Sequence, residues 1–322
     1  MDMSAPPASP MPATPSGSPE PASSGFSLKD LLALTKFRLS ALVIVTTLVA
    51  FWLRAGTRMD LWLLVHTIIG STLAAFGSAV FNQLMEIEPD SRMKRTADRP
   101  LPAGRISPSA AFGIGWLLSA LGLIHLVHRV NAEAAALTAM TLATYLFIYT
   151  PLKRQSTLNT LVGAVSGALP PLIGWAGAAG PATAGGAYFR WSLLVEPGAI
   201  YLFALLFLWQ LPHFLAINWM YRDEYVRGGF VMLANEDEEG ARTSKHALAW
   251  SVAMLLLMFQ PVFHGLVKTW LFLPPALFLN LWLCQRALVF QKQPERGTAR
   301  SLFFGTLIYL PVILIVSVIA WK

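Results

Sequence analysis

The chain has 322 residues, of which 55% are hydrophobic and 13% charged, and its mean hydropathy is +0.55. This composition excludes an ordinary soluble domain of the same length and indicates a polytopic membrane protein. The net charge of +7 does not indicate binding of nucleic acid, because the basic residues fall in short segments between apolar runs.

Residues 1–27 are rich in Pro, Ser and Ala and predict a disordered tail, because their small apolar surface does not offset the entropy of the chain. They hold no Lys or Arg, which argues against a secretory signal and a mitochondrial transit peptide. We therefore expect a bacterial plasma (inner) membrane. Residues 28–38 mix leucines with basic residues, as in a segment lying at a membrane surface, and 28–322 predict one membrane domain.

Nine apolar runs follow, each near the ~20 residues that a helix needs to span a hydrocarbon core. They cover roughly 39–55, 61–81, 109–128, 133–150, 160–178, 192–217, 246–264, 267–286 and 301–321. We therefore predict an all-α fold of nine transmembrane helices. With a cytoplasmic N-terminus, 18 of the 24 Lys and Arg residues lie on the cytoplasmic side, and the C-terminus lies outside.

The segment from Phe81 to Arg105 carries many of the charges. Asn82, Glu86 and Asp90 are spaced i, i+4, i+8, so they would share one face of a continuous helix. Oxygen ligands on one face suit Mg²⁺, which takes one or two carboxylates and completes its shell with water and phosphate oxygens. Pro89 complicates this geometry, since it predicts a helix end near Glu88 and Asp90 on a loop.

Basic residues near these oxygens suit the phosphates of a substrate. They comprise Arg92, Arg95, Arg99 and Arg105 in the same segment, with Lys153 and Arg154 before the fifth span. An alternative is that they only fix the orientation of the protein in the membrane. That alternative does not explain the acidic residues, which contribute little to orientation and are costly near the apolar phase.

A second polar segment ends the sixth apolar run. It contains His213, Asn218, Arg222 and Asp223. A histidine alone is more often satisfied by a neighbouring carbonyl than engaged in chemistry, but here an amide and a carboxylate follow at the same membrane face as the first cluster. Together the two segments predict a site that holds a diphosphate at the surface and an isoprenoid in the apolar interior, which is the arrangement for prenyl transfer.

The sequence also resembles the UbiA superfamily of intramembrane prenyltransferases, and within it the protohaem IX farnesyltransferases, or haem O synthases. The resemblance runs from about Leu34 to the C-terminus. Its motifs are LTKFRLS, NQLMEIEPDSRMKRTADRPLPAGRI, YTPLKR, GALPPLIGW, and WQLPHF followed by RDEY and GGFVML.

The resemblance implies a UbiA-type bundle around a central cavity, with N-x-x-x-D-x-x-x-D as the Mg²⁺–diphosphate motif. Here Glu86 replaces the middle Asp, which keeps the charge and lengthens the reach. The superfamily's second Asp-rich motif is replaced by the His213 segment, a departure typical of the haem-directed branch that leaves the number of Mg²⁺ ions open.

The resemblance implies farnesyl transfer from farnesyl diphosphate to a vinyl group of haem b, with addition of water, giving haem O. Its expected residues fall into three groups. The catalytic group is Asn82, Glu86, Asp90, His213 and Asp223; the metal ligands are Asn82, Glu86 and Asp90; the diphosphate- or propionate-binding group is Arg92, Arg95, Arg99, Arg105, Lys153, Arg154, Asn218 and Arg222. Expected partners are the lipid bilayer and a haem A synthase or oxidase assembly factors.

Two other functions remain open from the sequence. One is prenylation of an aromatic acid or quinone precursor, which would use the same motif after the second span. The other is transport, since polar residues at span ends also form ion pathways. Neither inverted repeats nor polar residues at the bilayer midplane, which are typical of transporters, are evident.

Overall fold

A computed structural model describes residues 27–181 and 189–322, and in them nine helices are long and apolar enough to cross a membrane, as predicted. The spans are α2 (Phe37–Ala55, extended by η1, Gly56–Arg58), α3 (Leu61–Met85), α5 (Pro108–Arg129), α6 (Ala132–Ala143, continued by η2, Thr144–Tyr149, and α7, Thr150–Leu152), α8 (Asn159–Gly177), α9 (Pro197–Met220), α11 (Ala241–Leu257, continued by α12, Gln260–Phe263), α13 (Thr269–Lys292) and α14 (Arg296–Ala320). The predicted tail lies outside the described residues except for Ser27, whose side chain caps the next helix.

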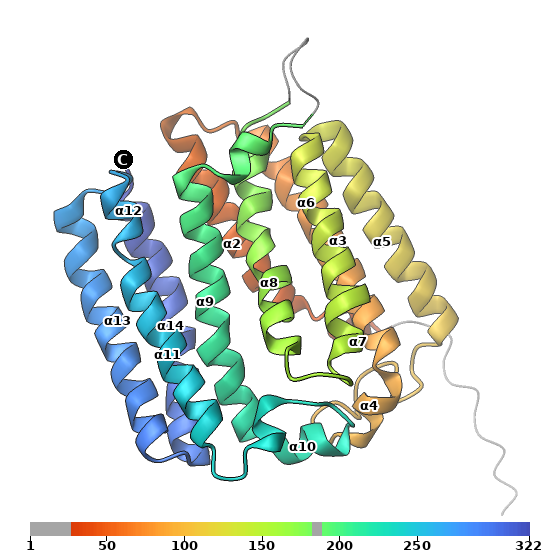
Figure 1. The fold of residues 1–322 in the computed structure, drawn as a ribbon. Helices are drawn as coiled ribbons and strands as arrows, with labels where there is room; N and C mark the ends of the chain where they lie inside the picture. The colour runs from red at the N-terminus through yellow and green to blue at the C-terminus, as the bar shows by residue number, and fades with distance from the viewer. Residues whose placement is uncertain (1–26, 182–188) are drawn as a thin grey trace, which may run out of the picture.

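The remaining helices are short and lie outside the spans. They are α1 (Leu28–Leu34), α4 (Ile87–Arg92), η3 (Trp191–Leu194), α10 (Arg222–Arg227) and η4 (Leu233–Glu236). Helices α4 and α10 contact each other at one end of the bundle, the lower end in Figure 1, which we call the polar end. The C-terminus lies at the opposite end.

The spans pack as neighbours in a single bundle (Figure 1). Helix α3 packs along α5, α2 along α8, and α9 contacts α8, α11 and α14. Large apolar side chains face outward from the spans, among them Phe147, Phe278 and Trp116, which are 76%, 70% and 61% exposed. Such an apolar exterior is expected of helices that contact lipid, because hydrocarbon makes no demand for a polar surface.

Helix α8 is the most enclosed span and packs through its glycines. A Cβ atom built on Gly163 would come within 2.6 Å of the Tyr149 ring, and one on Gly167 within 2.0 Å of the Gln210 side chain. These two glycines therefore allow close helix packing, as small residues four apart commonly do in membrane helices.

The break after α3 differs from the prediction. Helix α3 ends at Met85, where the Glu86 N–H donates to the carbonyls of Asn82 and Gln83, and α4 begins at Ile87. Pro89 falls in the first turn of α4, where the missing N–H costs no helical hydrogen bond. Asp90 consequently lies on a short helix, and its predicted placement on a loop is wrong.

The fourth span contains a π-helical turn close to the polar end, which the sequence did not predict. This turn, Thr144–Tyr149, precedes α7, and the Thr150 hydroxyl donates to the Tyr145 carbonyl at 2.8 Å. Such turns are rare in proteins, and those that occur are often found at functional sites.

Candidate active site

The three residues of the predicted metal motif are all buried at the polar end. Asn82 lies in the last turn of α3, Glu86 between α3 and α4, and Asp90 in α4. Their exposed fractions are 0%, 4% and 1%. Burying an amide and two carboxylates is costly unless each is partnered, so their partners define the site.

Both carboxylates pair with a basic side chain. Lys153 Nζ donates to Glu86 Oε1 at 2.8 Å, and Arg99 Nη1 donates to Asp90 Oδ2 at 2.5 Å. Arg99 is in the loop after α4, whereas Lys153 follows α7 at the end of the fourth span. Two of the predicted phosphate-binding residues are therefore held against the predicted metal ligands.

Asn82 has a cationic partner that the sequence analysis did not assign to the site. Lys36 Nζ donates to Asn82 Oδ1, and the Asn82 amide donates to Thr150 Oγ1 at 3.4 Å. Lys36 caps α2 with φ 47°, the only positive φ of a non-glycine residue in the described ranges. A left-handed lysine is strained by about 1–3 kcal/mol, and such strain concentrates at functional sites. Lys36 belongs to the motif LTKFRLS, but its contact with Asn82 joins residues 46 positions apart, which the sequence alone does not show.

The charges of the cluster set its protonation. Burial alone would raise the pKa of Glu86, but the charges of Lys153 and Lys36 lower it below its usual range. Burial would lower the pKa of Lys153, but Glu86 and then Tyr149 raise it above its usual range. Burial, followed by the Arg99 charge, lowers the pKa of Lys36 to about 7. At neutral pH the Glu86–Lys153 pair is therefore ionised on both sides.

The segment after α10 closes over Lys153. The Val231 N–H donates to the Lys153 carbonyl at 2.7 Å, and Asn159 Nδ2 donates to the Val231 carbonyl at 2.6 Å. The Lys153 ammonium lies 4.5 Å from the centre of the Tyr149 ring and 5.8 Å from that of Phe230. The motifs YTPLKR and GGFVML are thus in direct contact, and both surround one lysine.

Three predicted phosphate-binding residues are not brought to the cluster. Arg92 is exposed and pairs with a carboxylate one turn away on its own helix. Arg105 pairs with Asp30 at 2.8 Å and Asp98 at 3.0 Å, which joins α1 to the loop after α4. Arg154 is exposed. Sequence spacing does not reveal which of the basic residues near the motif face the cluster and which face outward.

The predicted residues of α10 also lie outside the cluster. Asp223 is 86% exposed at its side chain and lies 3.8 Å from Arg222. Arg222 donates to a backbone carbonyl of the following loop at 3.1 Å. Arg95 instead lies over Tyr221 and Tyr225, at 5.2 Å and 5.9 Å from the ring centres. The loop after α4 and helix α10 are therefore joined by aromatic contacts, without a second acidic motif.

His213 contacts α14 instead of the carboxylates. Its ring stacks on Trp209 and Phe303 at 5.0 Å and 4.9 Å, and Nδ1 lies 2.8 Å from Thr306 Oγ1. The Thr306 hydroxyl donates to the Phe303 carbonyl at 2.6 Å, so its oxygen accepts from His213 Nδ1. This assignment leaves the lone pair on Nε2. The sequence suggests that His213 lies beside the first cluster, but its contacts in the structure are with α9 and α14.

Asn218 is buried on the same helix, with an exposed fraction of 4%. It lies five residues after His213, and five residues turn a helix by about 140°. The two side chains therefore lie on different sides of α9, and the second polar segment does not form one continuous site.

The donor set can accept a magnesium ion. No group of three or more His, Cys, Asp or Glu side chains suited to a metal occurs in the described residues, so an ion would rely on two carboxylates, one amide and substrate oxygens. Mg²⁺ is bound in this way when it accompanies a phosphate. The oxygens of Asn82, Glu86 and Asp90 each accept a hydrogen bond from a basic side chain, which is consistent with a site for positive charge.

Comparison with known proteins agrees with the motifs. The UbiA prenyltransferase family matches residues 43–308. The chain is 38% identical to the protoheme IX farnesyltransferase of Solibacter usitatus over 295 residues, which cover 89% of this chain and 96% of that relative.

Solved structures share the fold. Digeranylgeranylglyceryl phosphate synthase gives a TM-score of 0.74 at 16% identity, covering 91% of this chain and 98% of its own. A UbiA homologue from Archaeoglobus fulgidus bound to GPP and Mg²⁺ gives 0.56 at 14% identity, covering 89% and 99%. The bundle is thus of the UbiA type, as the resemblance implied. The chain belongs to the UbiA prenyltransferase family and, within it, to the protoheme IX farnesyltransferases.

Proposed function

We propose that this membrane prenyltransferase transfers the farnesyl group of farnesyl diphosphate to a vinyl group of haem b, giving haem O and diphosphate. The observation that carries the chemistry is the buried cluster in which the three motif residues meet Lys36, Lys153 and Arg99. The identity of the acceptor is supported by the similarity to protoheme IX farnesyltransferases over nearly the whole chain.

We propose Asn82, Glu86 and Asp90 as ligands of Mg²⁺. The Archaeoglobus fulgidus homologue, which shares the fold, is bound to Mg²⁺ with GPP. A bound Mg²⁺ would polarise the diphosphate oxygens and stabilise the charge that develops on the leaving group. The lowered pKa of Glu86 keeps this ligand anionic at neutral pH, as metal binding requires.

Lys153 and Arg99, which pair with the two carboxylates, are also our candidates for binding the diphosphate. Their N–H groups donate to diphosphate oxygens and stabilise these oxygens as the bond between the farnesyl carbon and the diphosphate breaks. The electron pair of that bond leaves with the diphosphate, and the farnesyl carbon becomes an allylic cation.

The acceptor reaction needs a nucleophile, a water molecule and a base. The terminal carbon of the vinyl group attacks the farnesyl cation, and positive charge moves to the carbon beside the porphyrin. Water adds to this carbon, and the proton of that water passes to a base, which completes the hydroxyethylfarnesyl group. His213 is our candidate, since its Nε2 carries the free lone pair.

We further propose that the polar end is cytoplasmic and that the membrane is a bacterial plasma membrane. The distribution of basic residues supports this orientation. Haem O formed here would pass to a haem A synthase or to oxidase assembly factors. Single cysteines placed near Arg95 and Arg227 should resist an impermeant thiol reagent in intact cells, and labelling of either from outside would contradict the orientation.

The function is tested with purified protein in lipid nanodiscs. Farnesyl diphosphate and Mg²⁺ are supplied with haem b, with 4-hydroxybenzoate, or with neither, and products are separated and identified by mass spectrometry. We expect a farnesylated haem only. Prenylated 4-hydroxybenzoate without any haem product would indicate the aromatic-acid branch instead.

A further inference from the structure

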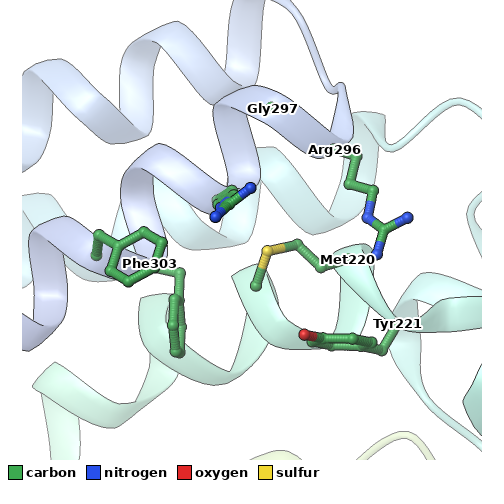
Figure 2. A pocket seen from close by; sticks show the side chains of 7 residues that line it. Met220, Tyr221, Arg296, Gly297 and Phe303 are labelled. Atoms are coloured by element: carbon green, nitrogen blue, oxygen red, sulfur yellow. The ribbon is translucent and has the colours of Figure 1, made fainter. Parts of the chain in front are cut away.

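A pocket of about 500 Å³ opens at the polar end, between the end of α9 and the start of α14. Figure 2 shows Met220 and Tyr221 facing Arg296 and Phe303 across it. Arg300 and Phe304 complete the polar and aromatic parts of its lining. The volume falls within the range of pockets that bury a small organic ligand.

The two arginines of this pocket are available to an anion. Arg296 and Arg300 are one helical turn apart on α14, and Phe303 follows on the same face. Both side chains are exposed, and neither has a side-chain hydrogen bond or ion pair within residues 27–181 and 189–322. Their recorded contacts are with aromatic rings: Arg296 lies 6.0 Å from the centre of Tyr221, and Arg300 lies 5.6 Å from that of Phe304.

The pocket adjoins the loop that carries the diphosphate motif. The ring of Tyr221 contacts both Arg296 and Arg95, which lie 6.0 Å and 5.2 Å from its centre. Arg95 belongs to the same loop as Arg99, which pairs with Asp90. One aromatic side chain therefore contacts both the pocket and the loop of the buried cluster.

We propose that this pocket is the subsite for the porphyrin acceptor, with Arg296 and Arg300 pairing with its two carboxylates and the aromatic side chains contacting its flat ring. The inference rests on the proposed function and assigns residues to its second substrate. Paired guanidiniums suit carboxylates, because each presents a planar fork of donors. Aromatic faces suit a planar π-system, whereas a lipid phosphate would need only the charges.

The test measures binding of haem b by absorbance titration in nanodiscs, with haem b dimethyl ester as the matched ligand that lacks the carboxylates. For the wild type we expect the ester to bind at least about 10-fold more weakly than haem b. The variant Arg296→Gln/Arg300→Gln should lose haem b affinity by a similar factor, and it should bind the ester as the wild type does. If the variant binds haem b and its dimethyl ester with equal affinity, these arginines are the partners of the carboxylates.

Two further variants serve as controls. Lys292→Gln removes one positive charge at the end of α13, four residues before Arg296 and outside the pocket lining, and it should bind haem b normally. Gly297 lines the pocket and a Cβ there meets nothing within 4 Å, so Gly297→Leu adds bulk at the lining without removing charge and should weaken binding of both ligands. A loss for Lys292→Gln equal to that of the arginine variant, or an ester effect that persists in the arginine variant, would overturn the proposal.

The experiment separates this inference from the proposed function. Titrations are repeated in nanodiscs of zwitterionic and of anionic lipid. If the arginine variant lost affinity for haem b only in the anionic lipid, the pocket would be assigned to a lipid headgroup instead. Normal farnesylation of haem by the arginine variant, with an unchanged KM for haem b, would overturn the subsite and leave the function standing. Arginine-dependent haem binding without any farnesylated product would retain the subsite and overturn the function.

Discussion

Removal of the Lys153 ammonium should expose how strongly the cluster depends on its charge pairs. In Lys153→Met the carboxylate of Glu86 stays buried but loses its 2.8 Å partner. Both side chains are well shielded, at 12% and 6% exposed, so the attraction is not strongly screened. Breaking a buried pair by removing one partner costs about 3–5 kcal/mol. At about 2 °C for each kcal/mol, the Tm should fall by roughly 6–10 °C.

The pH dependence of this loss provides a second check. Lys153 and its neighbours hold the pKa of Glu86 below its usual range, so the wild-type pair stabilises the fold at neutral pH and loses that contribution as the pH falls. Without the lysine, burial raises the Glu86 pKa, and protonation at low pH relieves the cost in the variant. The difference in Tm between wild type and variant should therefore shrink between pH 7.5 and pH 5.

The assay is thermal unfolding in detergent, followed by intrinsic fluorescence, with Lys94→Met as control. Lys94 is exposed on the same loop as Arg99. The double variant Lys153→Met/Glu86→Gln should recover much of the lost Tm, because no unpaired charge remains. If Lys153→Met unfolded within about 2 °C of Lys94→Met at pH 7.5, the reasoning about this buried pair would be refuted.

Three further predictions concern the site and its surroundings. Glu86→Gln and Asp90→Asn should each lower kcat by about 100-fold or more, while Asp98→Asn, whose side chain is 95% exposed, should not; equal activity in all three would contradict the ligand assignment. Chelation of divalent ions should abolish turnover and added Mg²⁺ should restore it, whereas full activity in excess chelator would exclude a metal. Glu196→Gln removes the charge that pairs with Arg54 at the far end of the bundle, while its amide oxygen can still accept from Trp175, and it should lower the stability by about 1 kcal/mol with unchanged kcat/KM.

The number of spans could be predicted because it depends on length and hydropathy alone. The predicted ends of the spans were less accurate, because the residue at which a helix begins or ends depends on local chemistry. The sixth run was predicted from residue 192, but the helix starts at Pro197, because the preceding residues form a separate 3₁₀ turn and Glu196 precedes a proline suited to a first turn. The π-helical turn at 144–149 has no periodic signal of its own.

Within the site, the residues of a local motif were predicted and those joined by tertiary contacts were not. Asn82 and Glu86 are one turn apart, so their proximity follows from the helix. Lys36 comes to Asn82 only because α1 and α2 meet at a left-handed residue, which no sequence rule required there. Conversely, His213 and Asp223 have the right chemistry, but α9 turns His213 toward α14 and α10 leaves Asp223 exposed.

The origin of the product's hydroxyl group tests the proposed reaction most directly. Purified protein is supplied with haem b, farnesyl diphosphate and Mg²⁺ in ¹⁸O-labelled water without oxygen, and the product is analysed by mass spectrometry. The account predicts a hydroxyethylfarnesyl haem that carries the heavy isotope, because water captures the cation beside the porphyrin. An unlabelled hydroxyl, a requirement for O₂, or a farnesylated haem without the hydroxyl would contradict it.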